Sequence, residues 1–252
     1  MGESPQPLAG RAVLVTGGAR RLGAALVRAI HAAGASLVVH YRRSADAARA
    51  LCGELNALRP NSAVAVAADL NDLADLESLP RATTQAFGRL DVLINNASTF
   101  YATPVGGIRL EAWNDLIGSN LRAPLFLAQA AVPSLKETHG LILNLIDIHG
   151  FRPLKQYPVY SIAKAGLVML TQSLARELGP DIRVNGIAPG SILWPEAPLD
   201  AELKARILDR TALKRAGSPE DIAKAALYFI RDAPYVTGQV LAVDGGRTVG
   251  GL

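Results

Sequence analysis

The sequence predicts a doubly wound α/β domain, and three observations support that prediction. Short runs rich in Val, Ile and Leu alternate with longer helical patterns along the whole chain. Most of these runs are apolar at nearly every position, which is typical of parallel strands covered on both faces. The first run passes through a glycine-rich turn directly into a helical pattern. A parallel sheet with helices on both faces follows from this alternation.

Each element is expected where the local pattern changes. Strands are expected at residues 12–15, 36–40, 63–67, 91–94, 141–146, 182–187 and 240–243. Helices are expected at about residues 22–33, 44–58, 72–87, 111–136, 157–179 and 219–231. Together they predict a Rossmann-type sheet of about seven strands, because parallel neighbours need crossover helices between them.

The length favours one domain. With 252 residues, half of them apolar, the chain is sufficient for one large core. We expect a flexible N-terminal segment at residues 1–9 and a single domain at 10–252. Residues 189–217, which include Pro195 and Pro198, form the longest irregular stretch. Such a segment in a compact domain often covers a site, so it is the expected substrate loop.

Composition excludes several classes of protein. The only cysteine, Cys52, has no partner for an intramolecular disulfide, and neither a signal peptide nor a membrane-length apolar run is present. These features predict a cytoplasmic protein that binds no membrane. The net charge is +4, but the arginines are scattered apart from two pairs at residues 20–21 and 42–43. The pattern favours a small anion over nucleic acid. His40 and His149 lack metal-ligand spacing, so no metal is expected.

The glycine-rich turn is a candidate phosphate site. Backbone amides at the start of a helix that follows a strand bind pyrophosphate, which requires glycines at close approaches. Arg21 occupies the place of the middle glycine, where it contacts either phosphate or substrate. The candidate cofactor residues of this turn are Gly17, Arg20, Arg21, Leu22 and Gly23.

The ends of the second and third strands predict the cofactor. An NAD enzyme usually carries an acidic residue after the second strand, whereas this chain carries His40, Tyr41, Arg42, Arg43 and Ser44. Guanidinium groups bind a 2′-phosphate, so NADPH is expected over NADH. The alternative is a solvated loop in which Ser44 caps the next helix. Asp69 and Leu70 are expected near the adenine, unless Asp69 only caps a helix starting near Asn71.

Three side chains form the candidate catalytic group. Tyr160 and Lys164 lie one helical turn apart on one face, so the ammonium is expected to lower the pKa of the phenol and make it a proton donor. Asp147 precedes the tyrosine by 13 residues at the end of a strand. A carboxylate beside a phenol favours an acceptor other than an ordinary ketone, although Asp147 at a strand end could instead form a cap.

These residues resemble the short-chain dehydrogenase/reductase family over essentially the whole chain after Gly10. The matching positions are Thr16, Gly17, Gly23, Asn95, Asn96, Ala97, Asn120, Tyr160, Lys164, Pro189, Gly190, Asp244, Gly245 and Gly246. The resemblance implies that Asn96 supports the adenosine side and Asn120 holds a relay water. It also implies that Tyr160 transfers the proton and Lys164 binds the nicotinamide ribose.

Two departures narrow the resemblance to the pteridine reductase branch. Most family members carry serine at Asp147 and glycine at Arg21. The branch implies further cofactor contacts from Asn96, Ala97, Ser98, Pro189, Gly190 and Ser191. It implies substrate contacts from Arg21, Ser98, Phe100, Asp147, Tyr160, Leu193 and Trp194, with Phe100 stacked on the pterin. The substrate is then biopterin, dihydrobiopterin or a folate-like molecule.

Several alternatives stay open. One alternative is a carbonyl or 3-oxoacyl-thioester reductase in which Asp147 is a tolerated variant, and another is a non-catalytic NADP(H)-binding regulator with the same fold. Phe100 could be ordinary core, and Trp194 could serve packing instead of a lid.

Family analogy implies a homotetramer built on the long helices near 111–136 and 157–179 and on the terminal strand. The small and apolar pattern Ala163, Gly166, Leu167, Leu170 and Leu174 suits helix–helix contact between subunits or core packing equally well.

Overall fold

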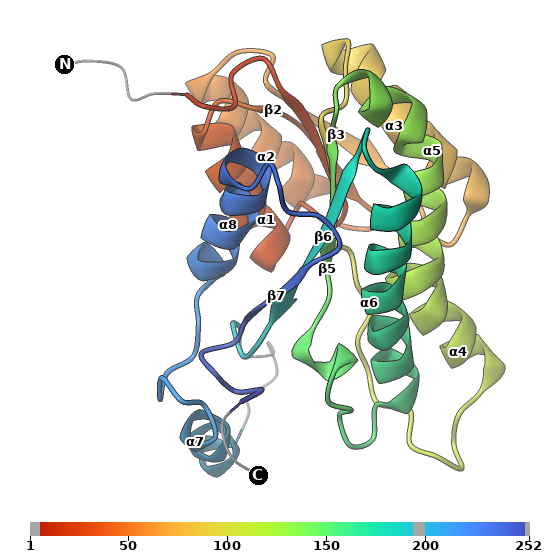
Figure 1. The fold of residues 1–252 in the computed structure, drawn as a ribbon, viewed down its shortest axis with the longest axis vertical. Helices are drawn as coiled ribbons and strands as arrows, with labels where there is room; N and C mark the ends of the chain where they lie inside the picture. Colours follow the sequence, from red (N-terminus) through yellow and green to blue (C-terminus); the bar gives the residue numbers. More distant parts are fainter. Residues whose placement is uncertain (1–5, 194–199, 250–252) are drawn as a thin grey trace.

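A parallel sheet of seven strands organises the molecule. The computed structural model describes residues 6–193 and 200–249, and Figure 1 shows the sheet between two layers of helices. The strands are β1 (Ala12–Val15), β2 (Ser36–Tyr41), β3 (Ala63–Ala67), β4 (Val92–Asn95), β5 (Leu141–Leu145), β6 (Arg183–Pro189) and β7 (Val240–Val243). Their order is β3-β2-β1-β4-β5-β6-β7, and every pairing is parallel. The predicted Rossmann-type architecture is confirmed.

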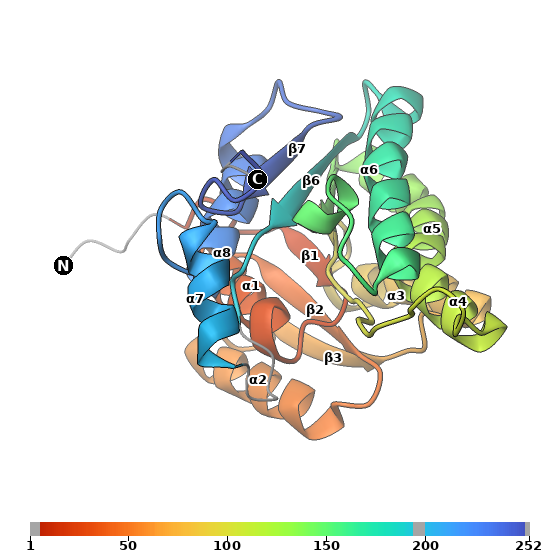
Figure 2. The same ribbon diagram turned by 90° about the horizontal axis from the view of Figure 1, so that it is seen from below.

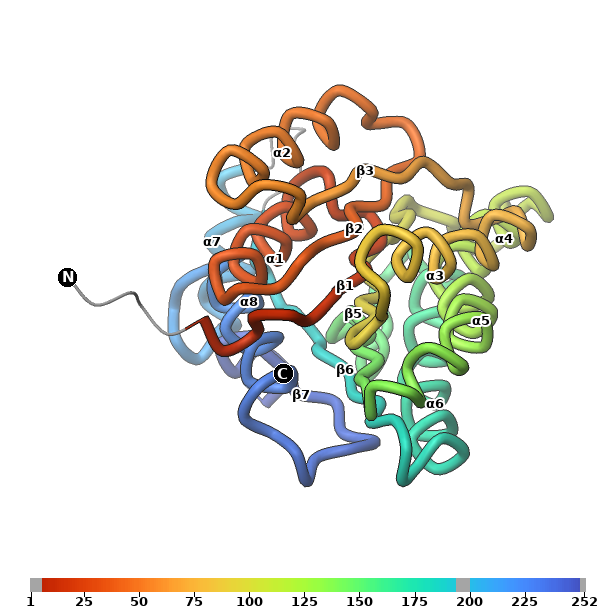
Figure 3. Tube along the Cα trace, turned by 90° about the horizontal axis from the view of Figure 1, so that it is seen from above, coloured from red at the N-terminus to blue at the C-terminus, as the bar shows by residue number. Residues whose placement is uncertain are grey.

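Helices cover both faces, as the sequence predicts (Figure 3). One layer holds α1 (Arg21–Ala32), α2 (Ala45–Leu58) and α8 (Pro219–Leu227), and the other holds α3 (Leu73–Phe87), α5 (Ala123–Glu137) and α6 (Pro158–Leu178). Two further helices, α4 (Leu110–Ile117) and α7 (Ala201–Asp209), are visible in the view from below in Figure 2. Within the described residues, no helix has the length and apolarity needed to cross a bilayer.

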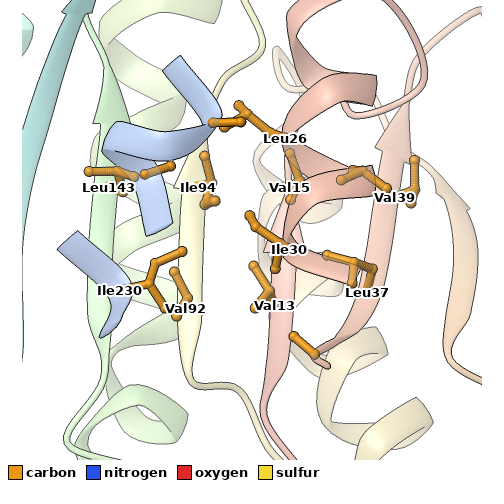
Figure 4. Packing of buried hydrophobic residues seen from close by; sticks show 14 of the residues in the cluster. Val13, Val15, Leu26, Ile30, Leu37, Val39, Val92, Ile94, Leu143 and Ile230 are labelled. Carbon is orange, nitrogen blue, oxygen red and sulfur yellow. The ribbon is translucent and has the colours of Figure 1, made fainter. Parts of the chain in front are cut away.

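The strands are apolar throughout because successive side chains enter different cores. Val13 and Val15 of β1 belong to the cluster under α1 and α8, whereas Leu14 belongs to the cluster under α3 and α5. Figure 4 shows Val13 and Val15 on the same side of the sheet as Leu26 and Ile30 of α1. All five side chains are fully buried. A polar side chain inside such a strand needs a partner within the protein, as Asn144 and Asn185 have.

The helix expected at residues 111–136 is interrupted in the structure. A π-helical turn, η1 (Gly118–Arg122), separates α4 from α5. Pro124 has no amide hydrogen to donate to the carbonyl of Asn120, so a regular α-helical bond is lost at this point. The interruption places Asn120 on a widened turn. A second π-helical turn, η3 (Tyr228–Asp232), extends α8.

The stretch at residues 189–217 is less irregular than predicted, because it contains α7. This helix begins at Asp200, whose side chain accepts a hydrogen bond from the amide of Glu202. None of its residues is fully buried, although Leu203, Ile207 and Leu208 recur at helical spacing and are partly buried. At the other end of the chain, Leu8 is fully buried and its amide donates to the carbonyl of Ala33. Packing therefore includes a residue before the expected start at position 10.

A chain of buried polar side chains links β4, β5 and α6. The Asn95 amide donates to Asn144 Oδ1 at 2.8 Å, and the Asn144 amide donates to Thr171 Oγ1 at 2.9 Å. Thr171 in turn donates to the carbonyl of Leu167 at 2.8 Å. Asn144 and Thr171 are fully buried, so each group depends on its protein partner.

We expect Asn144→Leu to lower the free energy of unfolding by about 2–4 kcal/mol, because it removes the acceptor of the buried Asn95 amide and the donor to the buried Thr171 hydroxyl. Urea unfolding measures this loss. Thr171→Val removes a different part of the same chain. The double variant should lose less than the sum of the two single losses, since the removed groups depended on each other. Additive losses would contradict the coupling.

Candidate functional site

A groove crosses the carboxyl edge of the sheet at the point where strand order reverses, between β1 and β4. In doubly wound sheets this is the usual place for a ligand. The groove has a volume of about 430 Å³. It is lined by Gly17, Arg20, Arg21, Leu22, Gly23, His40, Arg42, Asp69, Leu70, Asn71, Asn96, Ala97, Ser98, Thr99 and Ser119. Most residues predicted to bind a cofactor therefore share one cavity.

The glycine-rich turn leaves no space for larger residues. A Cβ on Gly23 would lie 2.1 Å from the carbonyl oxygen of Gly17, so α1 starts in direct contact with the turn. The Asn96 amide donates to the carbonyl oxygens of Thr16 and Gly17 at 2.8 and 3.1 Å. Asn96 therefore supports this turn, as expected. Arg21 has a φ of 51°, a conformation that favours glycine, at the position where the sequence replaces a glycine.

His40 supports the same turn from β2. The amide of Gly17 donates to His40 Nδ1 at 3.0 Å, and Nε2 lies 3.1 Å from the carbonyl oxygen of Ala68. Since a carbonyl can only accept, Nε2 carries the hydrogen and the ring is neutral. Burial lowers the pKa of His40, which favours the same state. His40 thus positions the groove as well as lining it.

The end of β2 brings one of its two arginines to the groove. Arg42 lines the cavity, and its guanidinium lies 3.8 Å from Asp69 Oδ1. Tyr41, Arg43 and Ser44 are not among the lining residues. The side chain of Ser44 makes no capping bond to α2, so the predicted cap is wrong.

Asp69 also does not cap α3, because the side chain of Asp72 accepts from the amide of Ala74 at that end. Asp69 Oδ1 accepts from the amide of Asn71 instead. The carboxylate therefore orders the turn at the far end of the groove, next to Leu70.

Asp147 and Tyr160 form a direct hydrogen bond. The phenol donates to Asp147 Oδ2 at 2.9 Å, and the amide of His149 donates to Oδ1 at 2.9 Å. Asp147 is thus both the cap of a short 3₁₀ turn, η2 (Ile148–Gly150), and the partner of the phenol. The two roles use different oxygens of one carboxylate. The cap fixes the orientation in which the second oxygen meets the tyrosine.

The expected lowering of the Tyr160 pKa is wrong for this structure. Burial raises the pKa well above its ordinary value, and the Asp147 carboxylate raises it further, with a smaller opposing effect from the Ser98 hydroxyl. The prediction considered only the charge of Lys164. It could not include desolvation, which disfavours the phenolate. Tyr160 is therefore held in its protonated form.

Lys164 lies beneath the phenol and is itself fully buried. Its Nζ is 5.6 Å from the centre of the Tyr160 ring and donates to the carbonyl oxygen of Leu145 at 2.9 Å. Burial lowers the pKa of Lys164 to about 8, although the Asp147 carboxylate favours the charged form. The ammonium is therefore poised to lose its proton near neutral pH.

Asn120 connects the groove to the phenol through Ser98. The Ser98 hydroxyl donates to Asn120 Oδ1 at 2.7 Å. The Asn120 amide donates to the carbonyl oxygens of Thr99 and Leu116 at 2.9 and 3.0 Å. Asn120 therefore bonds to more than the helix backbone, and Ser98 lies between it and Tyr160. Its predicted relay water stays a prediction.

Phe100 is not a core residue. Half of its surface is exposed, its ring stacks on Tyr157 at 4.6 Å, and it meets the edge of Tyr160 at 4.8 Å. The Phe100 ring therefore lies beside Tyr160 and is supported by the ring of Tyr157. Such a surface can hold a flat ligand.

The remaining predicted residues follow β6. Pro189 ends this strand, and a Cβ on Gly190 would lie 2.7 Å from Asp244. Ser191 accepts a hydrogen bond from Arg247, and Leu193 is 40% exposed. Trp194 lies outside the described residues.

Sequence reasoning missed several residues that the structure brings to the site. Asn71, Thr99 and Ser119 line the groove, Tyr157 supports Phe100, and Arg247 reaches Ser191. The available signal was that they are close in the sequence to residues predicted for the site. No cluster of His, Cys, Asp or Glu that could hold a metal occurs in the part of the chain that the structure describes.

Comparison with known proteins places this site in a large group of enzymes. A family described as enoyl-(acyl carrier protein) reductase matches residues 17–248. Pteridine reductase 1 of Leishmania tarentolae is 36% identical, covering 94% of this chain and 96% of that protein. A 3-oxoacyl-[acyl-carrier-protein] reductase of Synechocystis is also 36% identical, covering 96% and 98%. The 3beta-hydroxysteroid dehydrogenase 1 of Eggerthella lenta is 35% identical, covering 96% and 95%. Equal similarity to different activities means that substrate choice must be argued from individual residues.

We expect Lys164 to titrate at a pH of about 8 in the ligand-free protein. Asp147→Asn should move this titration to lower pH, because it removes the carboxylate that favours the ammonium. Carbon-13 NMR of lysine side chains measures the titration, and Lys164→Met assigns the signal. An unshifted titration at the ordinary value of about 10.4 would contradict the burial effect.

Proposed function

We propose that this chain, which belongs to the short-chain dehydrogenase/reductase family and is an oxidoreductase, reduces the C=N bond of a pterin with NADPH. The observation that carries the proposal is the 2.9 Å hydrogen bond between the Tyr160 phenol and the Asp147 carboxylate. Biopterin, dihydrobiopterin and folate-like molecules share the required ring. Pteridine reductase 1 of Leishmania tarentolae supports the same choice by its name.

The sign of the charge beside Tyr160 favours a C=N acceptor. Hydride addition to a ketone builds negative charge on oxygen, which a neighbouring carboxylate opposes. Reduction of a C=N bond adds one hydride to carbon and one proton to nitrogen, and a carboxylate stabilises the positive charge that forms when the nitrogen is protonated first. The proton goes to the ring nitrogen next to the carbon that accepts the hydride. Tyr160 and Asp147 together supply that proton, because they share one hydrogen bond.

The groove fits a dinucleotide. Gly17 and Gly23 bring backbone close to any bound phosphate, in a turn where an added side chain would collide. Arg20, Arg21 and Arg42 supply positive charge along the same cavity. When bound, the nicotinamide cofactor supplies the hydride, and Lys164 is placed to bind its ribose. Ser98 and Asn120 hold the phenol side of the groove.

Arg42 supports NADPH over NADH. It lines the groove at the end of β2. The nearby carboxylate of Asp69 follows β3 and is 3.8 Å from the Arg42 guanidinium. A planar guanidinium makes paired, charge-assisted bonds to phosphate oxygens. We expect the ribose 2′-phosphate of NADPH to bind the Arg42 guanidinium.

Phe100 supports a flat substrate. Tyr157 stacks on its ring, and the Tyr160 ring packs against it in a T-shaped arrangement with the ring centres 4.8 Å apart, so an aromatic surface adjoins the proton donor. Stacking on such a surface orients a bicyclic ring relative to the acid. Arg21, Ser98 and Leu193 complete the proposed substrate contacts.

A 3-oxoacyl-thioester reductase is the second candidate. The matched family description and the Synechocystis relative both name acyl carrier protein reductases. In that case Asp147 serves mainly as the cap of η2, through the bond from His149. The same fold also suits a non-catalytic regulator, against which the ordered Tyr160 and Lys164 argue.

A homotetramer is the proposed assembly. Leu125 and Phe126 on α5, and Ile162 and Met169 on α6, are exposed apolar side chains. By contrast, the pattern formed by Ala163 and Leu167 faces the core, because both are buried. An interface on these helices would therefore use their outer face.

Oxidation of NADPH should proceed with biopterin, dihydrobiopterin or dihydrofolate, and much more slowly with an acetoacetyl thioester. Asp147→Ser should lower kcat/KM for the pterins by roughly 10²–10⁴-fold, the usual range for a lost acid–base group. Asp147→Asn is the matched control, because it keeps an oxygen for the cap. Turnover of the thioester but not the pterins would refute the proposal. Binding of NADPH without any turnover would favour a regulator.

Arg42→Gln should raise the dissociation constant of NADPH by about ten- to a hundredfold, the effect of losing a charged hydrogen bond. The dissociation constant of NADH should change little, because NADH lacks the 2′-phosphate. Arg43→Gln is the matched control, since Arg43 does not line the groove. Fluorescence titration with both cofactors measures the constants. Equal weakening of both would rule out a specific phosphate contact.

A further inference from the structure

Arg247 follows β7, a strand that carries none of the catalytic candidates Asp147, Tyr160 and Lys164. Asp147, Ser191 and Arg247 follow β5, β6 and β7, which are neighbours in the sheet. Their side chains therefore emerge along one stretch of the carboxyl edge. The Arg247 guanidinium donates to the Ser191 hydroxyl, which fixes its direction along that edge.

The turn that carries Arg247 is rigidly built. Asp244 Oδ1 accepts from the amide of Gly246 at 2.8 Å, and Oδ2 accepts from the amide of Thr248 at 2.7 Å. Gly245 and Gly246 have φ values of 65° and 80°, which reverse the chain after β7. A Cβ on Gly245 would lie 2.9 Å from the side chain of Thr211, so the turn packs tightly on the segment after α7.

The charge of Arg247 is only partly balanced. Burial lowers its pKa, the Asp147 carboxylate opposes that effect, and Arg210 adds repulsion. Asp244 is committed to the backbone of its own turn. Asp147 is committed to Tyr160 and to the amide of His149. Both carboxylates that favour the charged form of Arg247 therefore already hold other partners.

We propose that Arg247, held by its hydrogen bond to Ser191, is a specificity-determining residue that binds an anionic group on the substrate, away from the ring that is reduced. This inference rests on the proposed function and extends it to the substrate class. The selected substrate is a heterocycle with a carboxylate- or phosphate-bearing tail. Arginine suits this task because its planar fork pairs with either group.

Two pterins that differ in tail charge test the proposal. Dihydrofolate carries glutamate carboxylates, whereas dihydrobiopterin has an uncharged side chain. Arg247→Gln keeps a donor for Ser191 and removes the charge. The ratio of kcat/KM for dihydrofolate to that for dihydrobiopterin should fall about tenfold or more, and Arg247→Lys should restore part of it.

Arg215→Gln is the matched control, because it removes an arginine that is paired with Asp221. It should leave the ratio unchanged. Equal losses for both pterins after Arg247→Gln would overturn the proposal. In that outcome Arg247 acts elsewhere. A shifted pH profile would identify an effect on Asp147, and a raised KM for NADPH would identify an effect on the cofactor.

A binding measurement separates this proposal from the proposed function. Calorimetry with p-aminobenzoyl-glutamate, the charged tail alone, needs no turnover. We expect Arg247→Gln to weaken its binding about tenfold, and Arg215→Gln to leave it unaltered. No binding by the unaltered protein, or equal binding by both variants, would overturn the anionic subsite. Failure of all pterin reduction with tail binding retained would refute only the pterin assignment. Acetoacetyl-coenzyme A, which carries phosphates, then distinguishes a phosphate from a carboxylate preference.

Discussion

Burial of both faces of the parallel sheet is the constraint on which the rest of the molecule depends. Leu14 and Val15 of β1 point into opposite cores and are both inaccessible to solvent, so neither face of this strand is open to a ligand. Polar side chains buried within other strands, such as Asn144 and Asn185, are bonded to protein partners. Chemistry is therefore confined to the carboxyl edge, where the strands end and their backbones turn.

At that edge, single polar groups combine support with chemistry. One oxygen of Asp147 holds the amide of His149, and the other receives the phenol of Tyr160. His40 uses one ring nitrogen for the amide of Gly17 and the other for the carbonyl of Ala68. A side chain fixed by a structural bond presents its second group with little conformational freedom to lose, which is the condition for preorganised catalysis.

The sequence was sufficient for the strands and for most helices, because two-sided burial produces continuous apolar runs and amphipathic helices repeat apolar residues at helical spacing. It was insufficient for the π-helical break η1 within the helix expected at 111–136, and for α7, whose apolar residues are few and only partly buried. It was also insufficient for the state of Tyr160. The spacing to Lys164 showed a favourable charge, but the desolvation that raises the pKa depends on how completely the fold encloses the phenol. Arg247 was missed because its contact with Ser191 crosses between strands that are distant in sequence.

The comparisons limit what overall similarity can decide. A pteridine reductase, an acyl carrier protein reductase and a hydroxysteroid dehydrogenase are each 35–36% identical to this chain over nearly its full length. A shared fold preserves the site for hydride transfer but leaves the acceptor to residues at the rim. Charge is the property that separates these acceptors most sharply. A carboxylate at Asp147 disfavours a developing alkoxide, and the guanidinium of Arg247 favours an anionic tail. Under the proposed function, the two charges act on different parts of one substrate, and its ring and its tail are expected to be selected independently.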